Sequence, residues 1–149
     1  MATGNDPNLL KYENYKEQFK RLDKAIKNDF YLEAMFIAYA IIEDRTESIL
    51  SYEGNEIKSD RFVSVDKKLK KIKKIAEKKN SLPQKYFSYS LVDEILEWKE
   101  DRNQLIHALM KQSVTTEKLR ASACSGKDLA RTLANKATSY RRAVERNRK

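Results

Sequence analysis

The chain has 149 residues, enough for a single domain with a buried core, and 36% of them are charged. Its 3 Gly and 2 Pro are few for an all-β protein with many tight turns, and they allow no Gly-rich phosphate loop. One Cys and one His exclude an intrachain disulfide, a multi-Cys zinc site and a multi-His metal centre. The longest apolar run, residues 34–42, has nine residues, whereas a membrane helix needs ~20. Residues 1–14 hold no apolar stretch typical of a secretion signal. These counts predict a soluble, cytoplasmic, basic helical protein with no membrane partner, no metal and no cofactor.

The formal net charge of +9 is spread unevenly along the chain. Residues 116–149 contain ten Lys or Arg against three acidic residues, a local balance of +7. Residues 67–79 hold eight lysines, which indicate either a polyanion-binding stripe or a solubilising face. The C-terminal excess is richer in Arg, whose planar guanidinium suits phosphate, so we predict contacts there with RNA, DNA or an acidic partner. The residues concerned are Arg131, Arg141, Arg142, Arg146 and Arg148.

The first predicted helix covers about residues 9–27, because apolar residues recur there at intervals of three and four. Asn28 or Asp29 is a suitable N-cap for a second helix, which runs to about Ser51. Residues 34–42 of this helix are apolar on every face, so we expect it to be buried centrally or shared with a second subunit. Residues 51–61 are expected to form a loop. The stripe of the first helix consists of Tyr12, Tyr15, Phe19, Leu22 and Ile26.

Residues 62–76 are predicted to form a third helix, with lysines opposite an apolar stripe and a break before Pro83. Residues 86–90 are ambiguous. Ser90 and Asp93 resemble a capping box, from which a long helix continues to about Lys111. After a connector we expect a short helix at 117–124 and a final helix capped near residues 125–128. The sequence therefore predicts an all-α, single-domain chain of five or six helices.

The helix at residues 91–111 breaks the usual amphipathic pattern. Steps of 100° per residue place Arg102 near the middle of its apolar arc, and Asn103 and His107, four residues apart, at the edge of that arc. A guanidinium in such a position needs a buried partner, water or a ligand. The structural interpretation is an ion pair with Glu43 or Asp44, which follow the apolar run of the second helix. For His107 alone the structural interpretation is stronger, because a lone His is often a boundary residue with a satisfied ring.

Residues 98–107, Trp-Lys-Glu-Asp-Arg-Asn-Gln-Leu-Ile-His, resemble the R-x4-H motif of the HEPN superfamily in its R-N-x-x-x-H form. The apolar helix before the motif is also similar to that family, as is Trp98, an aromatic residue four positions before the arginine. So is the apolar second helix, which is followed by Glu-Asp-Arg. The resemblance covers about residues 9–111. Residues 116–149 form a basic C-terminal helical segment outside it.

This resemblance implies an up-down helical bundle that pairs as a homodimer, with the motif helices of two subunits building one composite site. Many family members are metal-independent endoribonucleases of toxin–antitoxin and antiviral-defence systems, and others bind nucleotides or RNA without cleaving it. The implied partners are therefore RNA, a second copy of the chain, and an antitoxin or other regulatory protein. The catalytic residues of the family correspond to Arg102, Asn103 and His107, and its supporting acidic residues to Glu43 or Asp44.

These residue types suit RNA cleavage without a metal. An imidazole transfers protons because its ordinary pKa, ~6.5, lies near working pH. A guanidinium stays charged and can bind two phosphate oxygens, which gain negative charge in the transition state. Asn103 can orient the imidazole or hold a phosphate oxygen. A dimer would supply two copies of His107, which can divide the acid and base roles. The products would carry a 2′,3′-cyclic phosphate, and DNA would resist cleavage.

Two other classes of function remain open. The chain can be a non-catalytic helical module that binds nucleic acid or a partner, with Arg102 in a structural ion pair. It can also be a helical subunit of a larger complex, whose apolar second helix packs on another protein. Binding of nucleic acid weakens steeply as salt rises, whereas an apolar interface does not weaken in this way. Cys124 lies on a different predicted helix from His107 and is interpreted as a structural thiol.

Overall fold

The computed structural model describes residues 7–54 and 63–148, and within these ranges it contains six α-helices and no strand. The prediction of an all-α chain is therefore confirmed. None of the helices in these ranges is long and apolar enough to cross a membrane. The helices are α1 (Pro7–Lys27), α2 (Tyr31–Tyr52), α3 (Val65–Ile75), α4 (Leu82–Tyr86), α5 (Tyr89–Lys111) and α6 (Thr116–Asn147).

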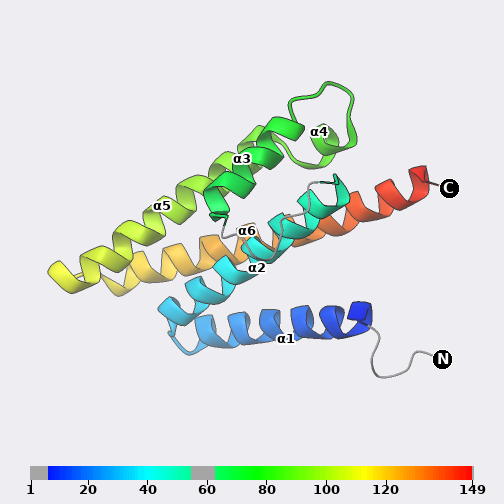
Figure 1. The fold of residues 1–149 in the computed structure, drawn as a ribbon. Coiled ribbons are helices and arrows are strands. Elements are labelled where there is room, and N and C mark those ends of the chain that lie inside the picture. Colours follow the sequence, from blue (N-terminus) through cyan, green and yellow to red (C-terminus); the bar gives the residue numbers. More distant parts are fainter. Residues whose placement is uncertain (1–6, 55–62, 149) are drawn as a thin grey trace.

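The most extensive contact between two helices is that of α2 with α6. Helix α6 has 32 residues and is therefore about 48 Å long. Figure 1 shows α2 and α6 packed together in the middle of the molecule. Helix α1 lies along one side of this pair, and α3, α4 and α5 lie on the other side. Because α5 and α6 are joined by a short connector, they run in opposite directions, and the end of α5 lies beside the start of α6.

The apolar second helix, α2, is buried centrally, which was one of the two predicted alternatives. Its side chains fill the space between α1, α3 and α6, and this burial of apolar area is the main stabilising term of the fold. One face of the helix is nevertheless uncovered, because Phe36 is 71% exposed and Leu32 is also exposed. The buried residues of α2 are Tyr31, Ala34, Met35, Ile37, Ala38, Ile41, Ile42, Thr46, Ile49 and Leu50.

The predicted break between a short and a final C-terminal helix is wrong, because α6 runs unbroken through residues 125–128. Gly126, which suggested the break, packs against the indole of Trp98 on α5. A Cβ atom at Gly126 would lie 2.4 Å from Trp98 Cζ2. The glycine therefore permits close contact between two helices and does not end one.

Several helix starts also differ from the sequence prediction. Helix α2 has Phe30 as its N-cap, without a side-chain cap, and Asp29 instead adopts a positive φ of 63° and accepts a hydrogen bond from Tyr31. Helix α5 is capped by Ser88, whose hydroxyl accepts from the Leu91 amide, so the predicted capping box at Ser90 is wrong. The ambiguous stretch before it contains the short helix α4. The predicted start of the third helix at residue 62 and most of the predicted loop lie outside the described residues.

Candidate functional site

The half of α5 that carries Arg102, Asn103 and His107 projects beyond the core. The first half of α5 is anchored by buried Leu91, Val92, Ile95 and Trp98. From residue 99 to residue 111 every side chain is exposed or only half-buried. The motif is therefore placed by the packing of the preceding two turns, and its own side chains are left at the surface.

Arg102 is half-buried and is held by two contacts. Its guanidinium carbon lies 4.1 Å from the ring centroid of Tyr39 on α2, and its Nη2 donates a hydrogen bond of 2.9 Å to Asn103 Oδ1. Its Nε is buried without a hydrogen-bond partner. Burial lowers the pKa of the Arg102 guanidinium, and the nearby Tyr39 hydroxyl partly opposes this shift. The group nevertheless remains a cation, since the ordinary arginine pKa is far above 7.

The predicted acidic partners of Arg102 are engaged elsewhere. Glu43 accepts a 3.3 Å hydrogen bond from Lys68 Nζ, and Asp44 forms an ion pair with Arg45 at 3.0 Å. Lys68 is almost completely buried, so it requires the nearby carboxylates. In the described ranges Arg102 makes no ion pair with either acid, and the interpretation of Arg102 as a buried ion pair is wrong. A supporting role for Glu43 or Asp44 in a site stays a prediction.

His107 is exposed and lies one turn after Asn103 on the same helix. Residues four apart on a helix are neighbours on its surface. Within residues 7–54 and 63–148 no side-chain hydrogen bond to His107 is found, so its imidazole is open to solvent on the side of α5 that carries Asn103. The structure thus brings Arg102 and Asn103 into direct contact and leaves His107 accessible one turn after Asn103.

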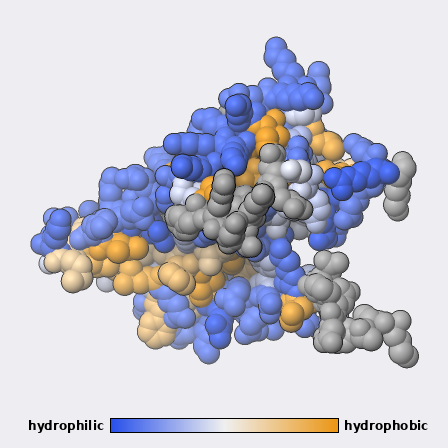
Figure 2. Space-filling model, viewed as in Figure 1, coloured by the Kyte–Doolittle hydropathy of each residue, from blue (hydrophilic) through white to orange (hydrophobic). Residues whose placement is uncertain are grey.

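Exposed apolar side chains surround this group of residues. Figure 2 shows apolar surface over the end of α5 and the beginning of α2. Met110, the penultimate residue of α5, is 88% exposed. We call this surface the apolar patch; its large members are Leu32 and Phe36 of α2 and Ile106 and Met110 of α5. A contiguous exposed apolar surface of this kind is typical of an interaction site.

The five arginines of the C-terminal segment are not brought to the motif. The Trp98 indole donates a 2.8 Å hydrogen bond to the Ser122 carbonyl, which fixes where α6 passes α5. Arg141 and Arg148 follow Ser122 by 19 and 26 residues on the same helix or its cap, and therefore lie roughly 30 and 40 Å further along α6. Four of the five arginines therefore lie in the half of α6 that is far from the motif, whereas Arg131 lies only about 14 Å beyond Ser122.

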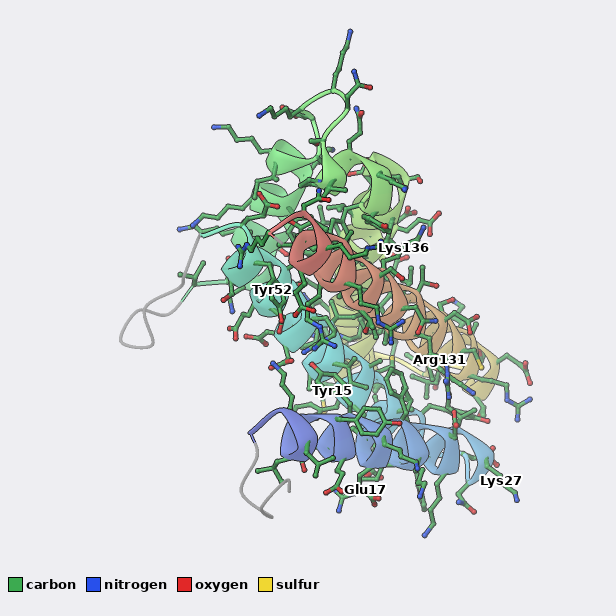
Figure 3. The ribbon with its side chains drawn as sticks, turned by 90° about the vertical axis from the view of Figure 1, so that its right-hand side faces the viewer. Tyr15, Glu17, Lys27, Tyr52, Arg131 and Lys136 are labelled. Carbon is green, nitrogen blue, oxygen red and sulfur yellow. The ribbon has the colours of Figure 1, made fainter. Side chains whose placement is uncertain are left out.

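Three of these arginines have partners within the chain. Arg131 pairs with Asp23 of α1 at 3.2 Å. Figure 3 shows where Arg131 lies on α6. Arg141 lies 4.0 Å from Glu145, and Arg148 donates to the Tyr52 carbonyl at 3.5 Å. Arg142 and Arg146 are exposed, and neither makes an ion pair with another described residue. These two are the arginines that remain available to an external anion.

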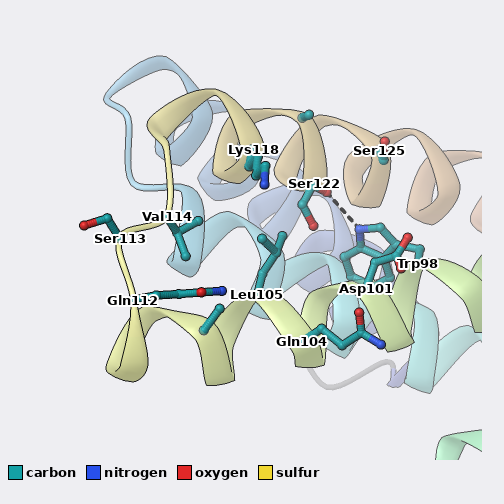
Figure 4. Close-up of a pocket in the computed structure, with 12 residues that line it drawn as sticks. Trp98, Asp101, Gln104, Leu105, Gln112, Ser113, Val114, Lys118, Ser122 and Ser125 are labelled. Atoms are coloured by element: carbon teal, nitrogen blue, oxygen red, sulfur yellow. Dashed lines mark hydrogen bonds between the residues drawn. The ribbon is translucent and has the colours of Figure 1, made fainter.

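A cavity of about 520 Å³ opens between α5 and the start of α6 (Figure 4). Trp98 and Leu105 form its apolar wall, and Asp101 and Lys118 lie at its rim. Its lining does not include Arg102, Asn103 or His107, so the cavity is separate from the motif.

Among the residues that the structure describes, no three His, Cys, Asp or Glu side chains are grouped so that they could hold a metal ion. Comparison of the chain with protein-family models, curated proteins and solved structures finds no match.

The sequence analysis missed Tyr39 as a part of this site. Tyr39 lies within the apolar run of the second helix, where an aromatic residue is expected to be part of the core. Its contact with Arg102 joins residues 63 positions apart in the chain. No spacing along a single helix could have indicated that contact.

Proposed function

We propose that the chain is a cytoplasmic, metal-independent endoribonuclease of the HEPN type, acting as a toxin or an antiphage-defence effector. The observation that supports this most is the state of Arg102. It is a half-buried cation without a carboxylate partner among the described residues, in contact with Asn103, which lies one turn from an exposed imidazole. An uncompensated guanidinium beside a polar amide and a histidine suits an RNA phosphate.

The chemistry requires only groups of this kind. One His107 imidazole accepts the proton of a ribose 2′-hydroxyl, whose oxygen attacks the adjacent phosphorus. The bond from phosphorus to the 5′-oxygen breaks, and an imidazolium donates a proton to that oxygen. Arg102 binds the non-bridging oxygens as their negative charge grows, and Asn103 holds Arg102 in place or contacts the phosphate. The products are a 2′,3′-cyclic phosphate and a 5′-hydroxyl.

Two histidines are needed for the acid and base roles, and each chain has one. A homodimer of up-down bundles provides the second when the apolar patch of one subunit covers that of the other. This arrangement would bury Phe36 and Met110, which are 71% and 88% exposed in the single chain, and would bring the motif halves of two α5 helices together. Burial of exposed apolar area is what stabilises such an interface.

The exposed Arg142 and Arg146 would then bind the RNA backbone at a distance from the cleavage site, or bind an acidic antitoxin. Arg131, Arg141 and Arg148 are also part of this cluster, but their partners within the chain must first be displaced. Contacts to phosphate at this distance would position the RNA without selecting its sequence.

Cleavage by matched variants tests the proposal. The purified chain is incubated with mixed RNA in excess EDTA, beside His107→Ala, Arg102→Ala and Glu97→Ala. Glu97 is an exposed residue of α5 outside the motif and serves as the control. We expect the parent and Glu97→Ala to cleave RNA, and the other two variants to lose at least about 100-fold in rate. Equal cleavage by the parent and His107→Ala would contradict the proposal.

A non-catalytic module that binds nucleic acid is the second candidate. It is favoured by the position of Arg142 and Arg146, which lie roughly 30 and 36 Å along α6 beyond Ser122, where Trp98 joins α5 to α6, since binding there does not require cleavage. RNA binding that weakens steeply with salt in the absence of any cleavage, and that is reduced in Arg142→Gln/Arg146→Gln, would support this candidate.

A further inference from the structure

Four arginines in the described residues stack on aromatic rings. Arg45 lies 4.2 Å from the ring centroid of Tyr15, Arg131 4.8 Å from Phe19, and Arg120 5.6 Å from Tyr31. The fourth is Arg102 on Tyr39, at 4.1 Å, the shortest of these distances.

A carboxylate accompanies the other three stacks. Asp44 lies 3.0 Å from Arg45, Asp23 lies 3.2 Å from Arg131, and Asp29 lies 3.7 Å from Arg120. Each of these three cations therefore has a carboxylate within 4 Å in the chain. Within the described ranges Arg102 has a ring and an amide, but no carboxylate.

The ring of Tyr39 limits the orientations of the Arg102 guanidinium without neutralising its charge. Tyr39 lies against one face of the Arg102 guanidinium, Asn103 takes a hydrogen bond from Nη2, and Nε is buried. The remaining terminal nitrogen, Nη1, has no hydrogen-bond partner in the described part of the chain. A phosphate oxygen can approach this nitrogen while the stacked geometry is retained.

We propose that Tyr39 is a positioning residue, whose ring on α2 holds the Arg102 guanidinium of α5 so that its free edge meets an RNA phosphate. The phosphate in this statement rests on the proposed function, whereas the effect of the ring on Arg102 does not. An aromatic ring holds the arginine in place and leaves its charge available. A carboxylate in the same position would cancel the attraction of the guanidinium for an anion. The hydroxyl of Tyr39 is not required, so phenylalanine suffices.

The position of Arg102 is tested first without RNA, by NMR of the arginine Nε–Hε groups in the full chain. The Arg102 signal is assigned by its loss in Arg102→Lys. We expect Tyr39→Phe to keep the signal at its parental shift, because a ring still lies against the guanidinium. Tyr39→Leu should move it toward the shift of exposed arginines, and Tyr12→Leu, at an exposed tyrosine of α1, should leave it unchanged. An unchanged signal in folded Tyr39→Leu overturns the proposal.

Cleavage kinetics provide the second readout. A misplaced Arg102 should reduce transition-state stabilisation, so Tyr39→Leu should lower kcat about tenfold with KM within about twofold, and Tyr39→Phe should restore the parental kcat. Tyr39→Leu with parental kcat would overturn the positioning role. If the parent cleaves no RNA but the NMR shift responds as described, the proposed function fails and the role of Tyr39 stands.

Discussion

Trp98 of α5 lies directly against Gly126 of α6, and its indole Nε1 donates a 2.8 Å hydrogen bond to the carbonyl of Ser122, one turn earlier. This contact joins the anchored half of α5 to α6 at the point where the motif half begins. It therefore sets the direction in which Arg102, Asn103 and His107 project from the core.

The first prediction concerns this contact. Gly126→Ala should lower the free energy of unfolding by about 1–3 kcal/mol, because the new Cβ would lie 2.4 Å from Trp98 Cζ2 and this overpacking exceeds the gain in helix propensity. Urea denaturation measures the change. Ser125→Ala, at the exposed preceding residue, is the control and should be neutral or slightly stabilising. If Gly126→Ala is as stable as Ser125→Ala, the close approach of the two helices is not required.

The second prediction concerns buried Lys68, which is 3% exposed and contacts Glu43 and Glu47. Burial lowers the pKa of Lys68, but hydrogen bonds and charges of Glu47 and Glu43 outweigh it and raise the pKa. Glu43→Gln/Glu47→Gln should therefore destabilise the fold by about 1–2 kcal/mol, a range reduced because the carboxylates are partly solvated. Lys68→Met removes the charge itself and should cost less than the double variant. Thermal denaturation measures the stability of both variants. A greater loss of stability for Lys68→Met than for the double variant would refute this explanation.

The third prediction concerns the loss of folding stability at acid pH. Burial raises the pKa of Asp44, but hydrogen bonds from Tyr15 and Arg45 and the charges of Lys11 and Arg45 outweigh it and hold the pKa below the ordinary 3.8. A carboxyl whose pKa is lower in the folded state stabilises the fold above its unfolded-state pKa. That contribution is lost as pH falls through the folded-state value.

Asp44→Asn should therefore be less stable than the parent at neutral pH, and the difference should shrink as pH falls below 3.8. Urea midpoints between about pH 2 and pH 6 measure this convergence. A difference that stays constant over this range would mean that the Asp44 charge does not stabilise the fold.

The fourth prediction concerns the apolar patch. Met110→Glu replaces a side chain that is 88% exposed, so it should leave the stability of the single chain unchanged within about 0.5 kcal/mol. In a homodimer the same change would place a charge in the interface, and we expect the dimer dissociation constant to rise at least tenfold. Sedimentation measures the fractions of monomer and dimer. Thr132→Glu, at an exposed residue of α6, is the control. A parent that stays monomeric at high concentration would contradict pairing through this patch.

The sequence predicted the parts of the structure that depend on local patterns. The all-round apolar residues 34–42 indicated a central helix, and that helix is buried between its neighbours. The position of Arg102 within an apolar arc indicated that its guanidinium needs a buried partner, water or a ligand, and the structure half-buries it against Tyr39. Both inferences use the helical period alone, so they did not require knowledge of which helices pack together.

What the sequence could not predict depends on contacts between helices. Gly126 was interpreted as a helix break, because only the position of Trp98 shows why a glycine is needed within α6. Arg102 was paired with Glu43 or Asp44, because nothing in the sequence shows that Lys68 and Arg45 engage those carboxylates. The separation of the arginine cluster from the motif follows from the unbroken α6, and was hidden by the predicted break.

Analysis of the RNA ends tests the central claim most directly. The parent and His107→Ala are incubated with a uniform RNA in excess EDTA, and the products are identified by mass spectrometry. We predict 2′,3′-cyclic phosphate and 5′-hydroxyl ends from the parent alone, with the matching DNA uncut. Products that end in a 3′-hydroxyl, or identical cyclic ends from His107→Ala, would contradict cleavage by 2′-hydroxyl attack at His107.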